Sequence, residues 1–265
     1  MEKIRLRDLR KSFGPKVVLD GVDLDIAAGE SLVVIGGSGT GKSVMLKHII
    51  GLLRPDSGTV EVDGVAVERL GNREITDFRR KFGMSFQEGA LFDSMTIWQN
   101  VAFPLQRLTK MSRKEIDERV KECLELVRLE GVEEKLPSQL SGGMRRRVGF
   151  ARAISHRPEI LLFDEPTTGL DPVTTALIDE VIVDLNDRLK TTTVTITHDM
   201  ESAFRIGDRI AMIHKGRIVA SAPPAEFRHL EDPRVQQFIH GRAEGPLSDE
   251  PGARTGPGQP KTPDR

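Results

Sequence analysis

The stretch Gly36-Gly37-Ser38-Gly39-Thr40-Gly41-Lys42-Ser43 decides how this sequence folds. It follows an apolar run at residues 32–35 and precedes a helical pattern at residues 44–50. A strand, a glycine-rich loop and a helix in this order form the context of a phosphate-binding loop. The glycines let backbone N–H groups point inward as a nest for phosphate oxygens, and the helix N-terminus adds positive charge. We therefore expect this loop to bind the phosphates of a nucleotide.

Two side chains of the loop have specific expected roles. Lys42 should reach the terminal phosphates as a mobile cation, and the Ser43 hydroxyl should ligate Mg²⁺. The alternative is a surface glycine loop without a ligand. The flanking strand and helix favour the phosphate-binding interpretation.

The composition limits the class of protein. The 265 residues allow one large domain or two small ones, and 38% hydrophobic residues are enough for a core. With 39 basic and 40 acidic residues, no overall field favours nucleic acid or an anionic membrane. We see no signal peptide and no apolar run of about 18 residues, so a membrane role would require separate spanning subunits. The single Cys123 excludes an internal disulfide and fits a reducing cytosol.

The first part of the chain is typical of strands. Alternating apolar residues predict strands at residues 2–9 and 17–26, and shorter strands follow at 59–62 and 82–86. Phe13 precedes the turn at Gly14-Pro15. Because the protein has no tyrosine, Phe13 is the natural candidate for stacking on a nucleotide base. Packing against the sheet edge is an equal alternative.

Helix signals replace strand signals between Glu88 and Pro158. Ser112 and Glu115 form a capping box before an apolar stripe that includes Cys123, which we therefore expect to be a core residue. Ser141 is a candidate N-cap for a helix that runs to about Ser155. The arginines at 145–147 are expected on the solvated, partner-facing side of that helix. We interpret residues 88–158 as a helical insertion in an α/β core.

The α/β pattern returns after this insertion. A continuous apolar run at 160–163 predicts a strand buried in a parallel sheet. A helix is expected at 172–189, and strands are expected at 193–197, 210–213 and 218–220. From residue 243 onward proline and glycine recur and apolar residues almost vanish, so we expect a disordered tail at 243–265.

Four polar residues follow the predicted strands. Asp164 should hold Mg²⁺, and Glu165 could orient and deprotonate a water that attacks the terminal phosphate. His198 could contact the γ-phosphate, and Gln87 could complete the metal shell or position the water. The carboxyl ends of parallel strands converge on the phosphate loop, which disfavours the alternative of a solvated acidic turn.

These motifs together resemble the nucleotide-binding subunit of an ATP-binding-cassette (ABC) transporter. Residues 36–43 match its Walker A motif, and residues 160–165 match Walker B with the catalytic glutamate. Gln87 matches the Q-loop, Asp171 the D-loop and His198 the switch histidine. The most specific match is Leu140-Ser141-Gly142-Gly143, the family signature. Two departures are Met144, where the signature usually ends in glutamine, and Phe13, where tyrosine is common.

The resemblance implies a fold and a mechanism. The fold is an α/β P-loop NTPase (RecA-like) core, at 1–87 and 159–242, with an antiparallel β subdomain and the helical insertion at 88–158. Two copies would close head to tail around two ATP molecules and Mg²⁺. Each ATP would lie between Walker A of one chain and Ser141, Gly142 and Gly143 of the other. The helical segment would transmit the motion to transmembrane permease subunits, with the Gln87 loop as the hinge.

Three stretches narrow the resemblance to the ATPase of Mla/Mce-type transporters: residues 86–96, 141–147 and 232–238. These transporters move phospholipids between the membranes of diderm bacteria, together with a permease and a lipid-binding Mce-domain protein. The resemblance implies a peripheral position on the cytoplasmic face of the inner membrane. Four apolar residues beside Gln87 suit a groove for a permease helix or ordinary core packing: Leu91, Phe92, Met95 and Trp98.

Three other functions remain open. The ATPase could serve an importer of a small solute, because other subunits recognise the cargo. A soluble cassette ATPase that acts on DNA or ribosomes usually carries two cassettes, a long coiled coil or a basic arm, and we see none of these. A nucleotide-binding protein without hydrolysis is disfavoured by Glu165.

Overall fold

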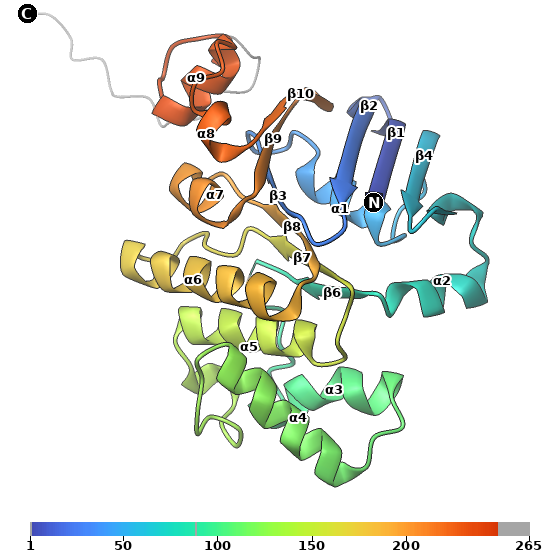
Figure 1. Ribbon diagram of the computed structural model, residues 1–265, viewed down its shortest axis with the longest axis vertical. Helices are drawn as coiled ribbons and strands as arrows, with labels where there is room; N and C mark the ends of the chain where they lie inside the picture. The colour runs from blue at the N-terminus through green and yellow to red at the C-terminus, as the bar shows by residue number, and fades with distance from the viewer. Residues whose placement is uncertain (1, 88, 249–265) are drawn as a thin grey trace, which may run out of the picture. The chain divides into compact units, whose positions relative to one another are not determined.

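The computed structural model describes residues 2–87 and 89–248. The chain divides into two compact units between Phe227 and Arg228. The first unit contains two β-sheets and most of the helices (Figure 1). The predicted α/β architecture, with an antiparallel β part and an inserted helical part, is therefore confirmed.

The larger sheet of the first unit has six strands in the order β10-β9-β3-β8-β7-β6. All neighbours are parallel except β9 and β10. The apolar runs at 32–35 and 160–163 lie in the interior of this sheet and are fully buried, as expected for parallel strands. The strands are β3 (Ser31–Ile35), β6 (Phe82–Ser85), β7 (Ile160–Asp164), β8 (Thr192–Ile196), β9 (Arg209–His214) and β10 (Arg217–Ala222).

The smaller sheet is antiparallel, with the strand order β2-β1-β4-β5. Its strands are β1 (Glu2–Phe13), β2 (Lys16–Ala27), β4 (Ser57–Val62) and β5 (Val65–Ala66). The predicted strand at 2–9 extends to Phe13, because the pairing with β2 continues to the turn. A single core joins the two sheets, and the helix α1 (Lys42–Ile49) contributes Met45, Leu46 and Ile49 to it.

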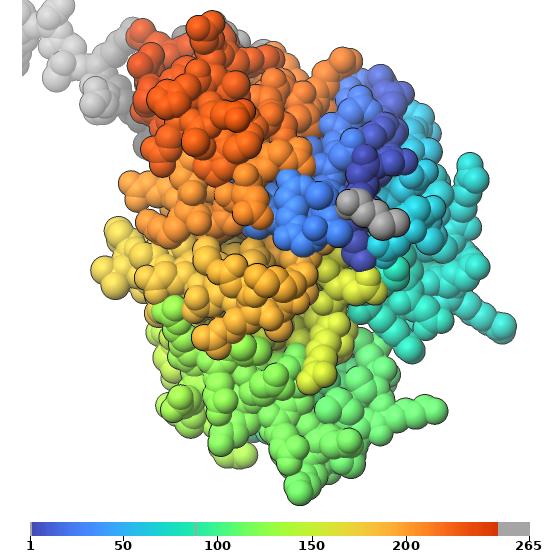
Figure 2. Space-filling view, in the orientation of Figure 1, coloured from blue at the N-terminus to red at the C-terminus, as the bar shows by residue number. Residues whose placement is uncertain are grey.

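Within residues 2–87 and 89–227, seven further helices belong to the first unit. In Figure 2 the green side chains of α4 and α5 form a lobe at the lower end of the view, apart from the blue strands β1 and β2. Among the described residues, no helix is both long and apolar enough to cross a membrane. The helices are α2 (Asn72–Arg79), α3 (Ile97–Leu108), α4 (Arg113–Leu126), α5 (Gly142–Ile154), α6 (Pro172–Leu189), α7 (Met200–Ile206) and α8 (Pro224–Phe227), with 3₁₀ turns at Val67–Arg69 and Pro137–Gln139.

The helix α4 begins as the sequence predicts. The Ser112 hydroxyl accepts a hydrogen bond from the Glu115 N–H, and the Glu115 carboxylate accepts one from the Ser112 N–H. Ile116, Val120 and Cys123 are buried on one face. Burial raises the pKa of the Cys123 thiol to about 12. Cys123 is therefore an unreactive core residue.

Of the arginines at 145–147, which were expected in solvent, Arg146 is buried, whereas Arg145 and Arg147 are partly exposed. The guanidinium of Arg146 is buried and donates to the Gln87 carbonyl. Arg147 donates to the Arg128 carbonyl at 2.7 Å, and Arg145 donates to the Leu140 carbonyl at 2.7 Å. The prediction was wrong for Arg146, because the carbonyl groups of Gln87 and Thr168 bind its guanidinium from within the chain.

Gly149 lies inside α5, where glycine is about 1 kcal/mol less favourable than alanine. A Cβ atom at Gly149 would lie 2.9 Å from the Gly89 Cα and 3.2 Å from the Ser85 Oγ. We expect Gly149→Ala to lower the free energy of unfolding by about 1–3 kcal/mol through this overpacking, despite the better helix propensity. Urea unfolding measures the change. An equal or higher free energy of unfolding would contradict the close packing of α5 on this loop.

The second unit contains the helix α9 (Pro233–His240). The buried Gln237 side chain donates to the Arg242 carbonyl at 3.1 Å and accepts from the Leu247 N–H at 2.7 Å. Residues 243–248 of the predicted disordered tail therefore form turns that are hydrogen-bonded to α9. The remainder of that predicted tail, 249–265, lies outside the described residues.

Candidate functional site

The glycine-rich loop connects β3 to α1, as the sequence predicts. Gly36 has a φ of +154°, and a Cβ there would lie 2.4 Å from the Ile213 carbonyl oxygen. Gly41, the N-cap of α1, has a φ of +105°, and a Cβ there would lie 2.8 Å from the Val18 carbonyl oxygen. Both positions therefore require glycine for two reasons, the backbone conformation and the lack of space.

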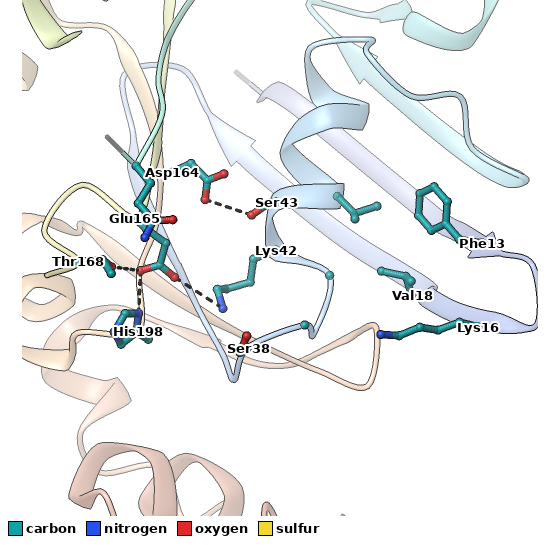
Figure 3. A pocket seen from close by; sticks show the side chains of 14 residues that line it. Phe13, Lys16, Val18, Ser38, Lys42, Ser43, Asp164, Glu165, Thr168 and His198 are labelled. Atoms are coloured by element: carbon teal, nitrogen blue, oxygen red, sulfur yellow. Dashed lines mark hydrogen bonds and ion pairs between the residues drawn. The ribbon is translucent and has the colours of Figure 1, made fainter. Parts of the chain in front are cut away.

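A cavity of about 730 Å³ opens over this loop, which is a suitable size for a nucleotide. Figure 3 shows Lys42 and Ser43 facing the two carboxylates, with Phe13, Lys16 and Val18 on the opposite side of the loop. The lining residues are Phe13, Lys16, Val18, Ser38, Gly39, Gly41, Lys42, Ser43, Val44, Gln87, Asp164, Glu165, Thr168 and His198. Most of the predicted ATP-binding and catalytic residues therefore share one cavity.

Lys42 lines this cavity next to Glu165. Its ammonium donates to the carbonyls of Gly36 at 2.7 Å and Gly37 at 3.0 Å, and it lies 3.9 Å from a Glu165 carboxylate oxygen. Burial lowers the pKa of Lys42, although the charges of Glu165 and Asp164 act in the opposite direction. The Thr40 hydroxyl also donates to the Gly37 carbonyl at 2.9 Å. Gly36, Gly37 and Thr40 do not line the cavity, but they take part in the hydrogen bonds that hold the loop.

Ser43 and Asp164 form the predicted metal-binding pair. The Ser43 hydroxyl donates to the Asp164 Oδ1 at 3.1 Å. Burial raises the pKa of Asp164, although the Ser43 hydroxyl and Lys42 act in the opposite direction. Within residues 2–87 and 89–248, no group of three or more His, Cys, Asp or Glu side chains is placed to hold a metal. The hydroxyl oxygen of Ser43 and the carboxylate oxygens of Asp164 are ligands of the kind that Mg²⁺ takes, together with waters and phosphate oxygens.

The backbone turns at Glu165, directly after β7 ends. The φ of Glu165 is +52°, which is uncommon for a residue other than glycine. Its N–H donates to the Ile196 carbonyl on β8 at 2.9 Å, which stabilises this turn. The Glu165 Oε2 accepts from the Thr168 hydroxyl at 2.9 Å and lies 2.8 Å from the His198 Nδ1. The carboxylate is therefore held from two sides. Sequence reasoning missed Thr168, although its position three residues after Glu165 could have indicated it.

Phe13 ends β1 at the rim of the cavity. Its side chain is 47% exposed, so much of it is not covered by the sheet edge. The Lys11 ammonium lies 5.7 Å from the ring centroid. Sequence reasoning also missed Lys16 and Val18, which line the same part of the cavity. The exposed ring is available for stacking on a flat base.

The predicted signature and D-loop residues do not line this cavity. The exposed Ser141 caps α5, and its hydroxyl accepts from the Met144 N–H at 3.3 Å. Asp171 caps α6 and accepts from the Thr174 N–H at 3.0 Å, and the Thr174 hydroxyl lowers its pKa. The two helix starts are adjacent, because a Cβ on Gly143 would lie 2.4 Å from the Thr174 Cγ2. The exposed N-terminus of α5 therefore lies apart from the chain's own phosphate loop.

Residues 19–168 match the family model described as ABC transporter. The chain belongs to this family. It is an ATP-binding ATPase whose hydrolysis is coupled to transport. The sequence-based resemblance to this family, including the Mla-type ATPases, is confirmed.

Three relatives carry different transport names. The chain is 43% identical to the "Probable ribonucleotide transport ATP-binding protein mkl" of Mycobacterium leprae, over 92% of this chain and 70% of that protein. It is 37% identical to the "Intermembrane phospholipid transport system ATP-binding protein MlaF" of Haemophilus influenzae, over 92% of each chain. It is 45% identical to the "Methionine import ATP-binding protein MetN" of Carboxydothermus hydrogenoformans, over 84% of this chain and 66% of that protein.

A solved structure supports the same family. The ATP-binding cassette MJ0796, in a dimeric post-hydrolysis state with ADP and Pi, superposes with a TM-score of 0.76 and 35% sequence identity. The match covers 83% of this chain and 98% of that chain. The fold of the nucleotide-binding core is therefore that of an ABC ATPase.

Proposed function

We propose that this ABC ATPase energises the movement of phospholipids between the inner and outer membranes. The observation that carries this proposal is the relative MlaF, which matches over 92% of both chains and is named for intermembrane phospholipid transport. The partners would be transmembrane permease subunits and an Mce-domain lipid-binding protein. The chain would lie on the cytoplasmic face of the inner membrane.

In the proposed reaction, the loop from Gly36 to Ser43 binds the ATP phosphates, and Phe13 stacks on the base. Lys42 transfers its hydrogen bonds from the Gly36 and Gly37 carbonyls to the terminal phosphates. Ser43, Asp164 and Gln87 would hold Mg²⁺, which would supply charge neutralisation at the phosphates. Glu165 accepts a proton from the attacking water, and His198 orients the carboxylate from 2.8 Å.

Two copies of the chain would complete each site. Ser141, Gly142 and Gly143 lie at a helix N-terminus, which favours an anion, yet they do not line the cavity of their own chain. A second copy placed head to tail would bring them to the terminal phosphate, with Asp171 beside them. The dimeric state of MJ0796 supports the pairing of two copies.

The helical segment would transmit closure to the permease. Phe92 is 41% exposed, and its ring lies 5.0 Å from that of Phe103. Trp98 is covered by the Arg113 guanidinium, which lies 3.6 Å from the ring centroid. Phe92 would therefore contact a permease helix, whereas Trp98 serves mainly in packing.

A second candidate is the ATPase subunit of a small-solute importer. The relative MetN, at 45% identity, favours this function, although the chain spans only 66% of its length. The cargo is recognised by other subunits in either case. The two candidates therefore differ in the partner subunits that this chain would bind.

A membrane pull-down separates the two candidates. Tagged Glu165→Gln protein, recovered from its own cells, is analysed by mass spectrometry for proteins and for extracted lipids. We expect a permease, an Mce-domain protein and enriched phospholipid. Tagged Lys42→Ala protein is the control, because it should not form the ATP-bound dimer. A permease that co-purifies with a solute-binding protein and without phospholipid would overturn the lipid assignment and favour the importer.

A further inference from the structure

Arg146 connects two loops of the ATPase site without lining the cavity itself. Its side chain is 8% exposed. The Nε donates to the Gln87 carbonyl at 2.7 Å, and an Nη2 hydrogen bond reaches the Thr168 carbonyl. Gln87 follows β6 and Thr168 follows β7, and these two strands are neighbours in the sheet. One guanidinium on α5 therefore bridges the loops that leave two adjacent strands.

Thr168 continues this connection toward the reaction centre. Its backbone carbonyl accepts from Arg146, and its hydroxyl donates to the Glu165 Oε2 at 2.9 Å. Arg146 thus holds the backbone of Thr168, and the Thr168 hydroxyl in turn holds the Glu165 carboxylate. A shift of α5 would change the position of Thr168 and, through it, the orientation of the carboxylate.

The same face of α5 holds the Gln87 loop at further points. Arg152 donates to the carbonyls of Gly89 at 2.8 Å and Ala90 at 2.9 Å. Gly149, between the two arginines on this face, leaves room for the Gly89 backbone. These contacts join Gly89 and Ala90 to α5, the helix that carries Ser141 at its start.

We propose that Arg146 is a positioning residue that transmits the placement of α5 to Glu165 through Thr168. This inference rests on the proposed role of Glu165 as the base. A planar guanidinium can bind two acceptors at once, whereas lysine offers a single point charge and glutamine a shorter amide. Replacement of Arg146 should lower kcat, because the Glu165 carboxylate would be less well oriented. Nucleotide affinity should stay unchanged, because Arg146 does not line the cavity.

The test compares Arg146→Gln with Arg147→Gln on the same helix. Arg147 binds the carbonyls of Val127 and Arg128, which lie outside the ATPase cavity. We expect Arg146→Gln to lower kcat about tenfold, with KM for ATP within about twofold, and Arg147→Gln to keep kcat within about twofold. An unchanged kcat in folded Arg146→Gln, or an equal loss of kcat in both variants, would overturn the proposal.

A second variant tests the route through Thr168. Thr168→Ala removes the hydroxyl beside Glu165 and leaves the buried guanidinium in place, so it remains informative if Arg146→Gln does not fold. We expect a similar loss of kcat, and a double variant no slower than the slower single variant. If the two losses of kcat multiply in the double variant, or if Thr168→Ala keeps the wild-type kcat, this route is wrong.

The Glu165→Gln variant distinguishes a failure of the proposed role of Glu165 from a failure of the proposed role of Arg146. If it retains turnover, the proposed role of Glu165 fails, and the route to that carboxylate fails with it. If it is inactive while Arg146→Gln turns over at the wild-type rate, the positioning role of Arg146 alone is wrong.

Discussion

Glu165→Gln is expected to stop ATP hydrolysis, with kcat reduced by roughly 10²- to 10⁴-fold, while ATP binding persists. An amide of the same shape can keep a hydrogen bond from the Thr168 hydroxyl, but it cannot accept the proton of the attacking water. The bound ATP should then hold two copies together. Phosphate release measures turnover, and size-exclusion chromatography with ATP measures the dimer.

Glu159→Gln is the matched control, because Glu159 is an exposed glutamate that precedes the other end of β7. This variant should hydrolyse ATP at the wild-type rate. Near-wild-type hydrolysis by Glu165→Gln would exclude Glu165 as the base. Inactivity together with loss of ATP binding would instead assign it a role in binding.

Lys42→Ala is expected to weaken ATP binding by about 100-fold or more. The ammonium makes charge-assisted hydrogen bonds, and its two present acceptors are carbonyls of the phosphate loop itself. Alanine would leave the terminal phosphates without this cation in a partly buried site. Equilibrium titration with a fluorescent ATP analogue measures the affinity.

Lys47→Ala is the control for this experiment, because Lys47 is an exposed cation on the same helix. It should bind ATP with wild-type affinity. Thermal unfolding of both variants without nucleotide tests whether the loop still folds. Unchanged affinity in Lys42→Ala would remove Lys42 from the binding site.

The sequence predicts most of the sheet and the cavity because their signals are local. The apolar runs at 32–35 and 160–163 match buried parallel strands, and polar residues at the strand ends meet at one edge. The short helices α2 and α7 were not predicted, since each spans too few residues for a clear helical period. Strand length was also underestimated for β1, whose outer end alternates less clearly.

Arg146 and Thr168 were mispredicted or missed for different reasons, a contact between distant segments and a local turn. Arginines usually lie in water, so Arg146 was expected to face solvent. Its acceptor Gln87 is 59 residues away in the chain, and no pattern within α5 indicates that bond. Thr168 was missed because its hydroxyl meets Glu165 only through the turn that a positive φ creates. The roles assigned to the phosphate-loop residues, Asp164, Glu165, His198, Phe13, Gln87, Asp171 and the signature residues all stay predictions.

The burial of Cys123 has a practical consequence for spectroscopy. A thiol with a pKa near 12 is almost entirely protonated at neutral pH, and maleimide dyes react with thiolates. Since the sequence contains no other cysteine, a cysteine introduced on the surface would be the single labelled position without prior removal of the native one. One dye on each of two copies would then report their separation by energy transfer during the ATP cycle.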